Sequence, residues 1–167
     1  MANDWIYSSE VDLTNAGADD LTAVTLISGL PSGLEEIEVF IIDASTDAEN
    51  TAMILRIGDA GGIEATAYDS ASTSGTTNSG LKTTHYSTSP DAHVDAATIT
   101  NGCWRMYRLD MSQHIWIAEW RAMREGIGGN SIGLGFKELS EEITQFQITT
   151  VAGTAAFDGG VSRTRYR

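Results

Sequence analysis

The sequence predicts an all-β protein, built as an antiparallel β-sandwich that is jelly-roll-like in size. Segments rich in β-branched and aromatic residues recur along the 167-residue chain, and several alternate between apolar and polar positions. Clusters of glycine, asparagine and aspartate separate these segments at regular spacing, as turns do between strands. The chain has only two prolines and no long stretch with a convincing helical period. We therefore expect a single domain over residues 1–167 with about ten or eleven short strands.

The central stretch, residues 34–68, is expected to supply three consecutive antiparallel strands. Apolar side chains at alternate positions predict a strand with one buried face. They are Ile37, Val39 and Ile41 in the first strand, with Glu36, Glu38 and Phe40 facing the other way, and Met53, Leu55 and Ile57 in the second. A polar hairpin loop over residues 43–50 would join these two strands. The turn residues Gly58, Asp59, Gly61 and Gly62 precede a third strand, Ile63 to Tyr68.

Flanking strands on both sides complete the predicted sandwich. They lie at residues 5–13 and 21–27 before the centre, and at 94–99, 103–110, 115–123, 132–136, 146–150 and 161–166 after it. A helix over residues 115–124 is an alternative for one of them. Asn101-Gly102 favours a tight hairpin turn, and Phe157 to Gly160 is read as another turn. In that turn Phe157, flanked by small residues, is expected to anchor in the core, and Asp158 to accept hydrogen bonds.

Residues 69–91 differ in composition from their surroundings, because 14 of these 23 residues are serine, threonine or glycine. Such a run predicts a surface hairpin or a flexible loop rather than a core strand. Function tends to sit on loops that a rigid scaffold holds. The two large ring side chains of the segment, His85 and Tyr86, are therefore candidate contacts to a ligand or a host surface.

Acidic and basic side chains are unevenly distributed. The first 100 residues carry 16 acidic and 2 basic side chains, whereas the remaining residues carry 7 and 8. Seven of the ten basic residues fall in two clusters, Arg105, Arg108, Arg121 and Arg124, and Arg163, Arg165 and Arg167. Two interpretations are open: two solvated faces, or complementary surfaces that meet between subunits. The net charge of −13 argues against nucleic acid as a partner, because phosphate binding needs a basic surface.

The chain lacks the common catalytic and metal-binding motifs, so neither an enzyme nor a cofactor is expected. His85, His93 and His114 do not have the spacing of metal ligands. Glu36 and Glu38 are about 6–7 Å apart on one strand face, as in some glycosidases. No aromatic sugar platform adjoins them, however, and acid pairs are common on the exposed strand faces of an acidic chain.

The sequence also bears on calcium binding, disulfide formation and membrane insertion. A calcium ion at Asp59 would have to recruit further carboxylates, so a turn is the expected role of that residue. The single cysteine, Cys103, excludes an internal disulfide and fits folding in a reducing cytosol. No apolar run is long enough to span a membrane, and the first residues lack the pattern of a signal peptide, so no membrane insertion is expected.

Two phrases of the sequence carry a resemblance to a known family. The first is LRIGDAGGIEATAY, residues 55–68, with ISGLPSGLEEIEVFI before it, and the second is ITTVAGTAAFDGG, residues 148–160. Both are similar to a β-domain found in tail and fibre proteins of tailed bacteriophages. In that family a phrase Thr-x-x-Gly-x-x-x-Phe-Asp-x-Gly closes the domain before a final strand, and here it ends in Phe157, Asp158 and Gly160. The resemblance implies a structural role for both motifs. The last strand departs from the family pattern, since it carries three arginines where the family is more apolar.

The resemblance implies a virion structural protein, made in the cytoplasm of the bacterial host and serving as a short fibre, spike or decoration subunit on the tail or head. Its partners would be other virion proteins, further copies of itself, expected as a trimer from the fibre context, and a host-surface glycan. The alternative is a carbohydrate-binding module that would use Trp116, Trp120 or Tyr86 as stacking platforms. A third interpretation is a small β-sandwich hydrolase.

Overall fold

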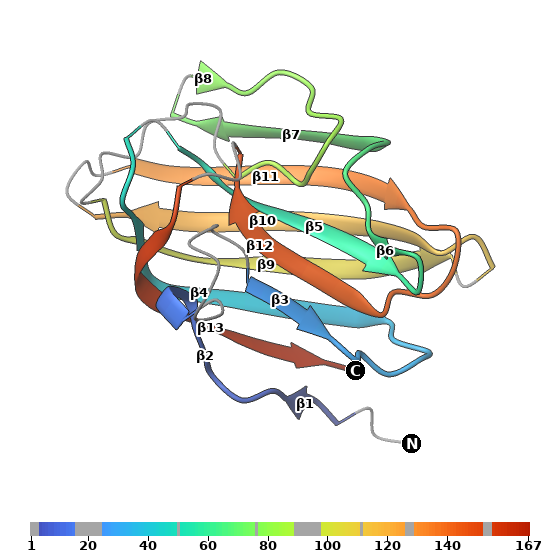
Figure 1. Ribbon diagram of the computed structural model, residues 1–167. Helices are drawn as coiled ribbons and strands as arrows, with labels where there is room; N and C mark the ends of the chain where they lie inside the picture. The colour runs from blue at the N-terminus through green and yellow to red at the C-terminus, as the bar shows by residue number, and fades with distance from the viewer. Residues whose placement is uncertain are drawn as a thin grey trace.

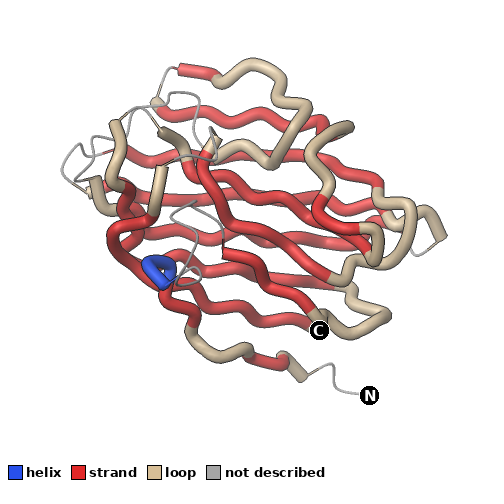
Figure 2. The backbone as a smooth tube through the Cα atoms, in the orientation of Figure 1, coloured by secondary structure: helices blue, strands red, loops and turns tan. Residues whose placement is uncertain are grey.

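The protein is a stack of two antiparallel β-sheets (Figure 1), seen in a computed structural model. The structure describes residues 4–15, 25–49, 51–75, 77–88, 98–110, 112–125, 129–151 and 155–167. Within these ranges the only helical element is one 3-10 turn, Leu13–Asn15, drawn in blue in Figure 2. The predicted all-β sandwich is therefore confirmed, and the helical alternative for residues 115–124 is wrong because that segment is a strand.

The larger sheet has nine strands in the order β1-β13-β4-β9-β10-β11-β7-β8, with β2 pairing beside β1 on β13. Their bounds are β1 Ile6–Tyr7, β2 Val11–Asp12, β4 Glu36–Thr46, β7 Tyr68–Ser74, β8 Thr77–Asn78, β9 Thr100–Asp110, β10 Ile115–Arg124, β11 Gly129–Glu138 and β13 Phe157–Tyr166. The smaller sheet has the order β3-β12-β5-β6. Its strands are β3 Thr25–Ser28, β5 Met53–Asp59, β6 Gly62–Ile63 and β12 Gln145–Thr150.

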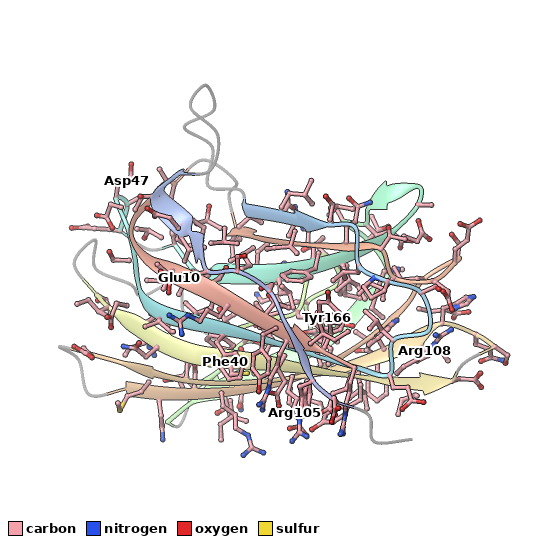
Figure 3. All side chains as sticks on the ribbon, turned by 90° about the horizontal axis from the view of Figure 1, so that it is seen from below. Glu10, Phe40, Asp47, Arg105, Arg108 and Tyr166 are labelled. Atoms are coloured by element: carbon pink, nitrogen blue, oxygen red, sulfur yellow. The ribbon has the colours of Figure 1, made fainter. Side chains whose placement is uncertain are left out.

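The hydrophobic core lies between the two sheets. The alternation predicted for the central stretch is confirmed, because Ile37, Val39 and Ile41 are all buried and belong to one core cluster. From the smaller sheet the cluster takes Leu55, Ile57, Phe146 and Ile148, and from the larger sheet also Trp104, Met106, Trp116, Trp120 and Phe157. The expectation that Phe157 anchors in the core is thus confirmed. The smaller sheet covers one face of the larger sheet, and the opposite face, called here the outer face, points away from it (Figure 3).

The predicted three-stranded meander over residues 34–68 is wrong. The strands β4 and β5 belong to different sheets, so the chain crosses the sandwich between Thr46 and Met53 and makes no hairpin there. The turn at Gly58–Gly62 is confirmed, because β5 pairs with β6 across it, but the strand that follows ends at Ile63. Alternation of apolar and polar residues identifies which side chains of a strand are buried. The same alternation arises whether the next strand pairs in the same sheet or packs from the opposite sheet, so it does not identify the neighbouring strand.

The serine- and threonine-rich segment is not simply a surface loop. Its first part forms β7, which pairs with β11 over six residues from Tyr68 to Thr73. Ser70 and Ser72 point into the sandwich, where Ser70 Oγ accepts a bond from the Ser87 amide at 2.8 Å and Ser72 Oγ lies 2.8 Å from Ser87 Oγ. Small hydroxyl side chains can line a core when every hydroxyl finds such a partner. Thr76 and residues 89–91 of the segment lie outside the described ranges.

Three further expectations about turns and strands are corrected. Asn101 and Gly102 lie inside β9, and Gly102 is required there because a Cβ would come within 2.6 Å of the Trp120 ring. Residues 157–160 belong to β13, where two irregularities in its pairing with β4 replace the predicted turn. The segment 5–13 is divided into β1 and β2. Of the predicted strand at 94–99, residues 94–97 fall outside the described ranges, as do residues 21–24 and His93.

Candidate functional site

The outer face of the larger sheet is built from rows of side chains that run across the strands. Outward positions pair across β4, β9, β10, β11 and β7 in a continuous register. The three rows are Glu36, Tyr107, Ile117, Phe136 and Asp69; Glu38, Arg105, Glu119, Leu134 and Ala71; and Phe40, Cys103, Arg121, Ile132 and Thr73. Cross-strand neighbours of this kind are close enough to interact. The face is therefore charged over β13, β4 and β9, with Glu119 and Arg121 of β10 at the boundary. Its apolar half lies along β11, with Ile117 of β10 and Ala71 of β7 beside it.

The charged half contains a network of two glutamates and three arginines. Glu36 forms ion pairs with Arg105 at 2.6 Å and with Arg167 at 2.5 Å. Glu38 pairs with Arg105 at 3.0 Å and also with Arg165. Both carboxylates are buried beneath the guanidinium groups, so the expectation of an exposed acid pair is wrong. The pairing with Glu36 is also the main reason why the pKa of Arg105 is raised.

Aromatic rings surround this network. The Arg165 guanidinium lies 4.4 Å from the centre of the Trp5 ring and 5.4 Å from that of Phe40. The Arg167 guanidinium lies 4.8 Å from the Trp5 ring, and Arg105 lies 4.8 Å from the Tyr107 ring. Stacked guanidinium groups keep their charge and lose less freedom when they form ion pairs. The network therefore ties the N-terminal strand segment and the last strand to the centre of the sheet.

Replacing Glu38 with glutamine is expected to lower the free energy of unfolding by about 1–3 kcal/mol, because a buried acceptor for two guanidinium groups is lost. The matched control is Glu119→Gln, which removes a more exposed carboxylate 3.6 Å from Arg121 on the same face. An exposed pair of that kind contributes about 0–1 kcal/mol. Urea unfolding followed by circular dichroism measures both variants. Equal losses in the two would contradict a structural role of the buried network.

The arginines proposed as subunit contacts are mostly engaged within the chain. Arg163 binds Glu10 through two nitrogens at 2.9 and 2.6 Å, and Arg108 pairs with Glu142 at 3.3 Å. Arg124 is buried and donates to Ser74 Oγ. The complementary charges of the two chain halves thus meet inside one molecule. Arg121 differs, because its side chain is 76% exposed beside Glu119, and for it a contact with another subunit stays a prediction.

The four residues predicted to touch a ligand or the host are buried. Tyr86, Trp116 and Trp120 belong to the core cluster, and His85 is also inaccessible. They cannot act as surface platforms for a sugar, so this prediction is wrong. The physical reason is that strand β10 turns Trp116 and Trp120 toward the smaller sheet, and that Tyr86 forms a bridge to Leu55 of β5. Composition alone had placed Tyr86 in a loop.

His85 gives the protein a predicted dependence on pH. Burial, with the nearby charges of Arg56 and Lys82, lowers the pKa of His85 to about 4, well below the ordinary value near 6.5. Below about pH 6.5 the His85 side chain of the unfolded chain therefore binds a proton, whereas that of the folded protein stays neutral down to about pH 4. The free energy of unfolding falls as the pH is lowered from about 6.5 to 4. We expect thermal unfolding of His85→Gln to depend less on pH over this window than that of the unaltered protein. Parallel curves would contradict the assignment.

The predicted motif residues have structural roles in the described chain. Asp59 accepts hydrogen bonds from the Gly61 amide at 2.8 Å and from Ser140 Oγ at 2.6 Å. The Ser140 bond is the main cause that lowers the pKa of Asp59. Gly58 is required because a Cβ there would lie 2.1 Å from the Gly62 carbonyl oxygen. At the other motif, Asp158 pairs with Ser45, and Gly160 has a φ of +97° against the backbone of Ala44.

The apolar half of the outer face is the feature that the sequence analysis missed. Strand β11 turns Ile132, Leu134 and Phe136 outward, and all three are exposed. Beside them a shallow groove of about 430 Å³ is lined by Leu81, Ala71, Ile132 and Leu134, among others. The signal was present in the sequence, since Gly133 and Gly135 alternate with these residues. Glycines at inward positions leave room for the Ser70 and Tyr86 side chains, which reverses the usual rule that the larger residue faces the core.

Among the described residues, no three His, Cys, Asp or Glu side chains are grouped so that they could hold a metal ion. No helix in this part of the chain has the length and apolar character to cross a membrane. Comparison of the chain with family models, with curated proteins and with solved structures gives no match.

Proposed function

We propose that this protein is a structural subunit of a tailed-bacteriophage virion, a short fibre, spike or decoration protein that assembles with other virion proteins. The observation that carries the proposal is the exposed apolar half of the outer face, with Ile132, Leu134 and Phe136 at alternate positions along β11. Exposed apolar patches of this kind are typical of protein interaction sites. The resemblance of residues 55–68 and 148–160 to tail and fibre domains supports the choice of a virion.

A structural role also fits the arrangement of the acidic side chains. Glu36 and Glu38 would be the acids of a hydrolase, but three guanidinium groups occupy their oxygens. A glycosidase needs one carboxyl group that is free to give up a proton and a second that is free to attack or to activate water. The proposal therefore assigns these glutamates to the stability of the sheet and assigns no reaction to the protein.

The proposal is tested on particles. Phage particles purified from the host that makes this protein should contain it at fixed stoichiometry when their proteins are quantified by mass spectrometry. A copy that carries an epitope tag should sediment with intact particles and should be visible on them by immunogold labelling. Absence from purified particles, with the protein abundant in the lysate, would refute the proposal.

Carbohydrate binding stays a second candidate because of another surface feature. A groove of about 460 Å³ beside β1 and β13 is lined by Tyr7, Phe40, Arg163 and Arg165. An exposed tyrosine and a second aromatic ring next to charged hydrogen-bond donors form a surface on which a host glycan could stack. Glycan-array binding by the isolated protein, lost on Tyr7→Ala, would establish this function, and an array without signal would remove it.

A further inference from the structure

We propose that the outer face of the larger sheet binds a second copy of this chain, in a two-fold dimer whose axis crosses the strands at Trp120. The inference deepens the proposed assembly role by naming a partner for the apolar half of the face. It stands on the charge, the geometry and the size of that face.

Charge favours a second copy on this face. Each chain carries a net charge of −13, so two copies repel one another over most of their surfaces. The three rows and the adjoining end of β13 are nearly neutral by comparison. They hold Arg105, Arg121, Arg163 and Arg165, with Arg167 just after β13, against Glu36, Glu38, Glu119, Asp69 and the Arg163 partner Glu10. An acidic protein can approach itself on such a face without a large electrostatic cost.

The geometry of β10 supports a two-fold arrangement. Glu119 and Arg121 flank Trp120 on the outer side of the strand and lie at the boundary between the charged and the apolar halves. A two-fold axis in the plane of contact, running across the strands at Trp120, places Glu119 of one copy opposite Arg121 of the other, twice. The same operation lays the apolar half against its equivalent, as an isologous interface requires.

The size of the face is sufficient for a stable contact. Five strands with a spacing of about 4.8 Å and a length of about 10 residues, at about 3.3 Å per residue, cover about 800 Å². A specific protein interface of standard size buries about 800 Å² on each partner. Ile132, Leu134 and Phe136 lie near the middle of the apolar half, where large side chains contribute most to binding.

Sedimentation equilibrium or light scattering of the full chain tests the inference. We expect the unaltered protein to have twice the mass of the 17.9 kDa chain at micromolar concentration. Leu134→Glu should weaken the dimer at least about tenfold, because it places a charge in each apolar half. The matched control is Leu26→Glu. Leu26 is 52% exposed on β3 of the smaller sheet, whereas Leu134 is 49% exposed, so this change should leave the dimer intact.

Salt separates this inference from assembly by surface ion pairs. Raising NaCl from about 0.1 M to about 1 M shortens the screening length from about 10 Å to about 3 Å. An apolar contact between two acidic chains should persist or strengthen, whereas a contact held by arginines and acids should dissociate. Circular dichroism of Leu134→Glu checks that the variant is folded, as an exposed position predicts.

Four results would overturn the inference: a monomer at micromolar concentration, a dimer that dissociates in about 1 M NaCl, a Leu134→Glu dimer as strong as that of Leu26→Glu, or a trimer. A trimer would support the expectation from fibre proteins and exclude a two-fold contact. A monomer that is nevertheless present in purified particles would contradict the dimer and leave the virion role standing, with another virion protein on this face. A dimer that is absent from purified particles would support the two-fold contact and refute the virion role.

Discussion

Tyr86→Ala is expected to lower the free energy of unfolding by about 3–5 kcal/mol, the range for removing a large aromatic side chain from a core. Tyr86 is only 2% exposed and joins the two sheets. Its amide donates to the Leu55 carbonyl at 3.0 Å, and its hydroxyl donates to the Trp116 carbonyl at 3.2 Å. The ring meets Tyr68 edge to face at 5.1 Å. A loss of this size is a large part of the roughly 5–15 kcal/mol that holds a domain together.

Tyr86→Phe provides the control, because it keeps the ring and removes only the hydroxyl. The expected loss is about 0.5–1.5 kcal/mol, the net contribution of one hydrogen bond. Urea unfolding at neutral pH measures both variants. If Tyr86→Ala unfolds at the same urea concentration as the unaltered protein, the ring is not part of the core and the loop interpretation of residues 69–91 would be correct.

The sandwich could be predicted because a strand with one buried face has a period that the sequence displays directly. Ile37, Val39 and Ile41 are buried as the alternation requires, and β9, β10 and β11 also lie close to their predicted positions. Pairing could not be predicted, because the same alternation fits a neighbour in the same sheet or a facing strand. That is why the passage from β4 to β5 across the sandwich was expected to be a hairpin.

The serine-rich strand β7 was missed because hydrophobicity is not the only way to fill a core. Ser70 and Ser72 face Gly135 and Gly133 of β11, and a Cβ at either glycine would come within 2.7 Å of neighbouring atoms. Small residues on both strands leave room for Tyr86. No rule based on one segment alone contains this information, since it depends on the pairing of residues about 60 positions apart.

The candidate site was misplaced for a related reason. Aromatic residues were expected at the surface because sugars stack on rings, yet Trp116 and Trp120 lie on the inward side of β10, and exposed aliphatic residues lie on β11. In a strand with apolar residues on both faces, the face that is buried is known only once the position of the partner sheet is known. The sequence shows where the arginines cluster but not which acids they pair with. Most of these arginines pair with acidic residues of the same chain.

Trp120→Ala is expected to be the most destabilising single substitution in the larger sheet. The Trp120 ring is 2% exposed, packs against Trp104 with 4.2 Å between ring centres and 39° between ring planes, and donates from Nε1 to Ser131 Oγ at 2.9 Å. Removing it leaves a cavity against Trp104 and a buried serine hydroxyl without this donor, so the expected loss is about 3–5 kcal/mol for the ring, increased by about 1 kcal/mol for the hydrogen bond.

The matched control for this prediction is Trp5→Ala, a change of the same size at the edge of the sheet. Trp5 is half-buried and packs on the Arg165 and Arg167 guanidinium groups, and a contact of this type contributes about 0.5–2 kcal/mol. Urea unfolding monitored by far-ultraviolet circular dichroism avoids the change in fluorescence that each variant causes. Trp120→Ala should lose cooperative unfolding or shift its midpoint far below that of Trp5→Ala. If the two midpoints coincide, or if Trp120→Ala keeps its stability and loses binding to a glycan, the ring is a surface platform and the inward orientation of β10 is wrong.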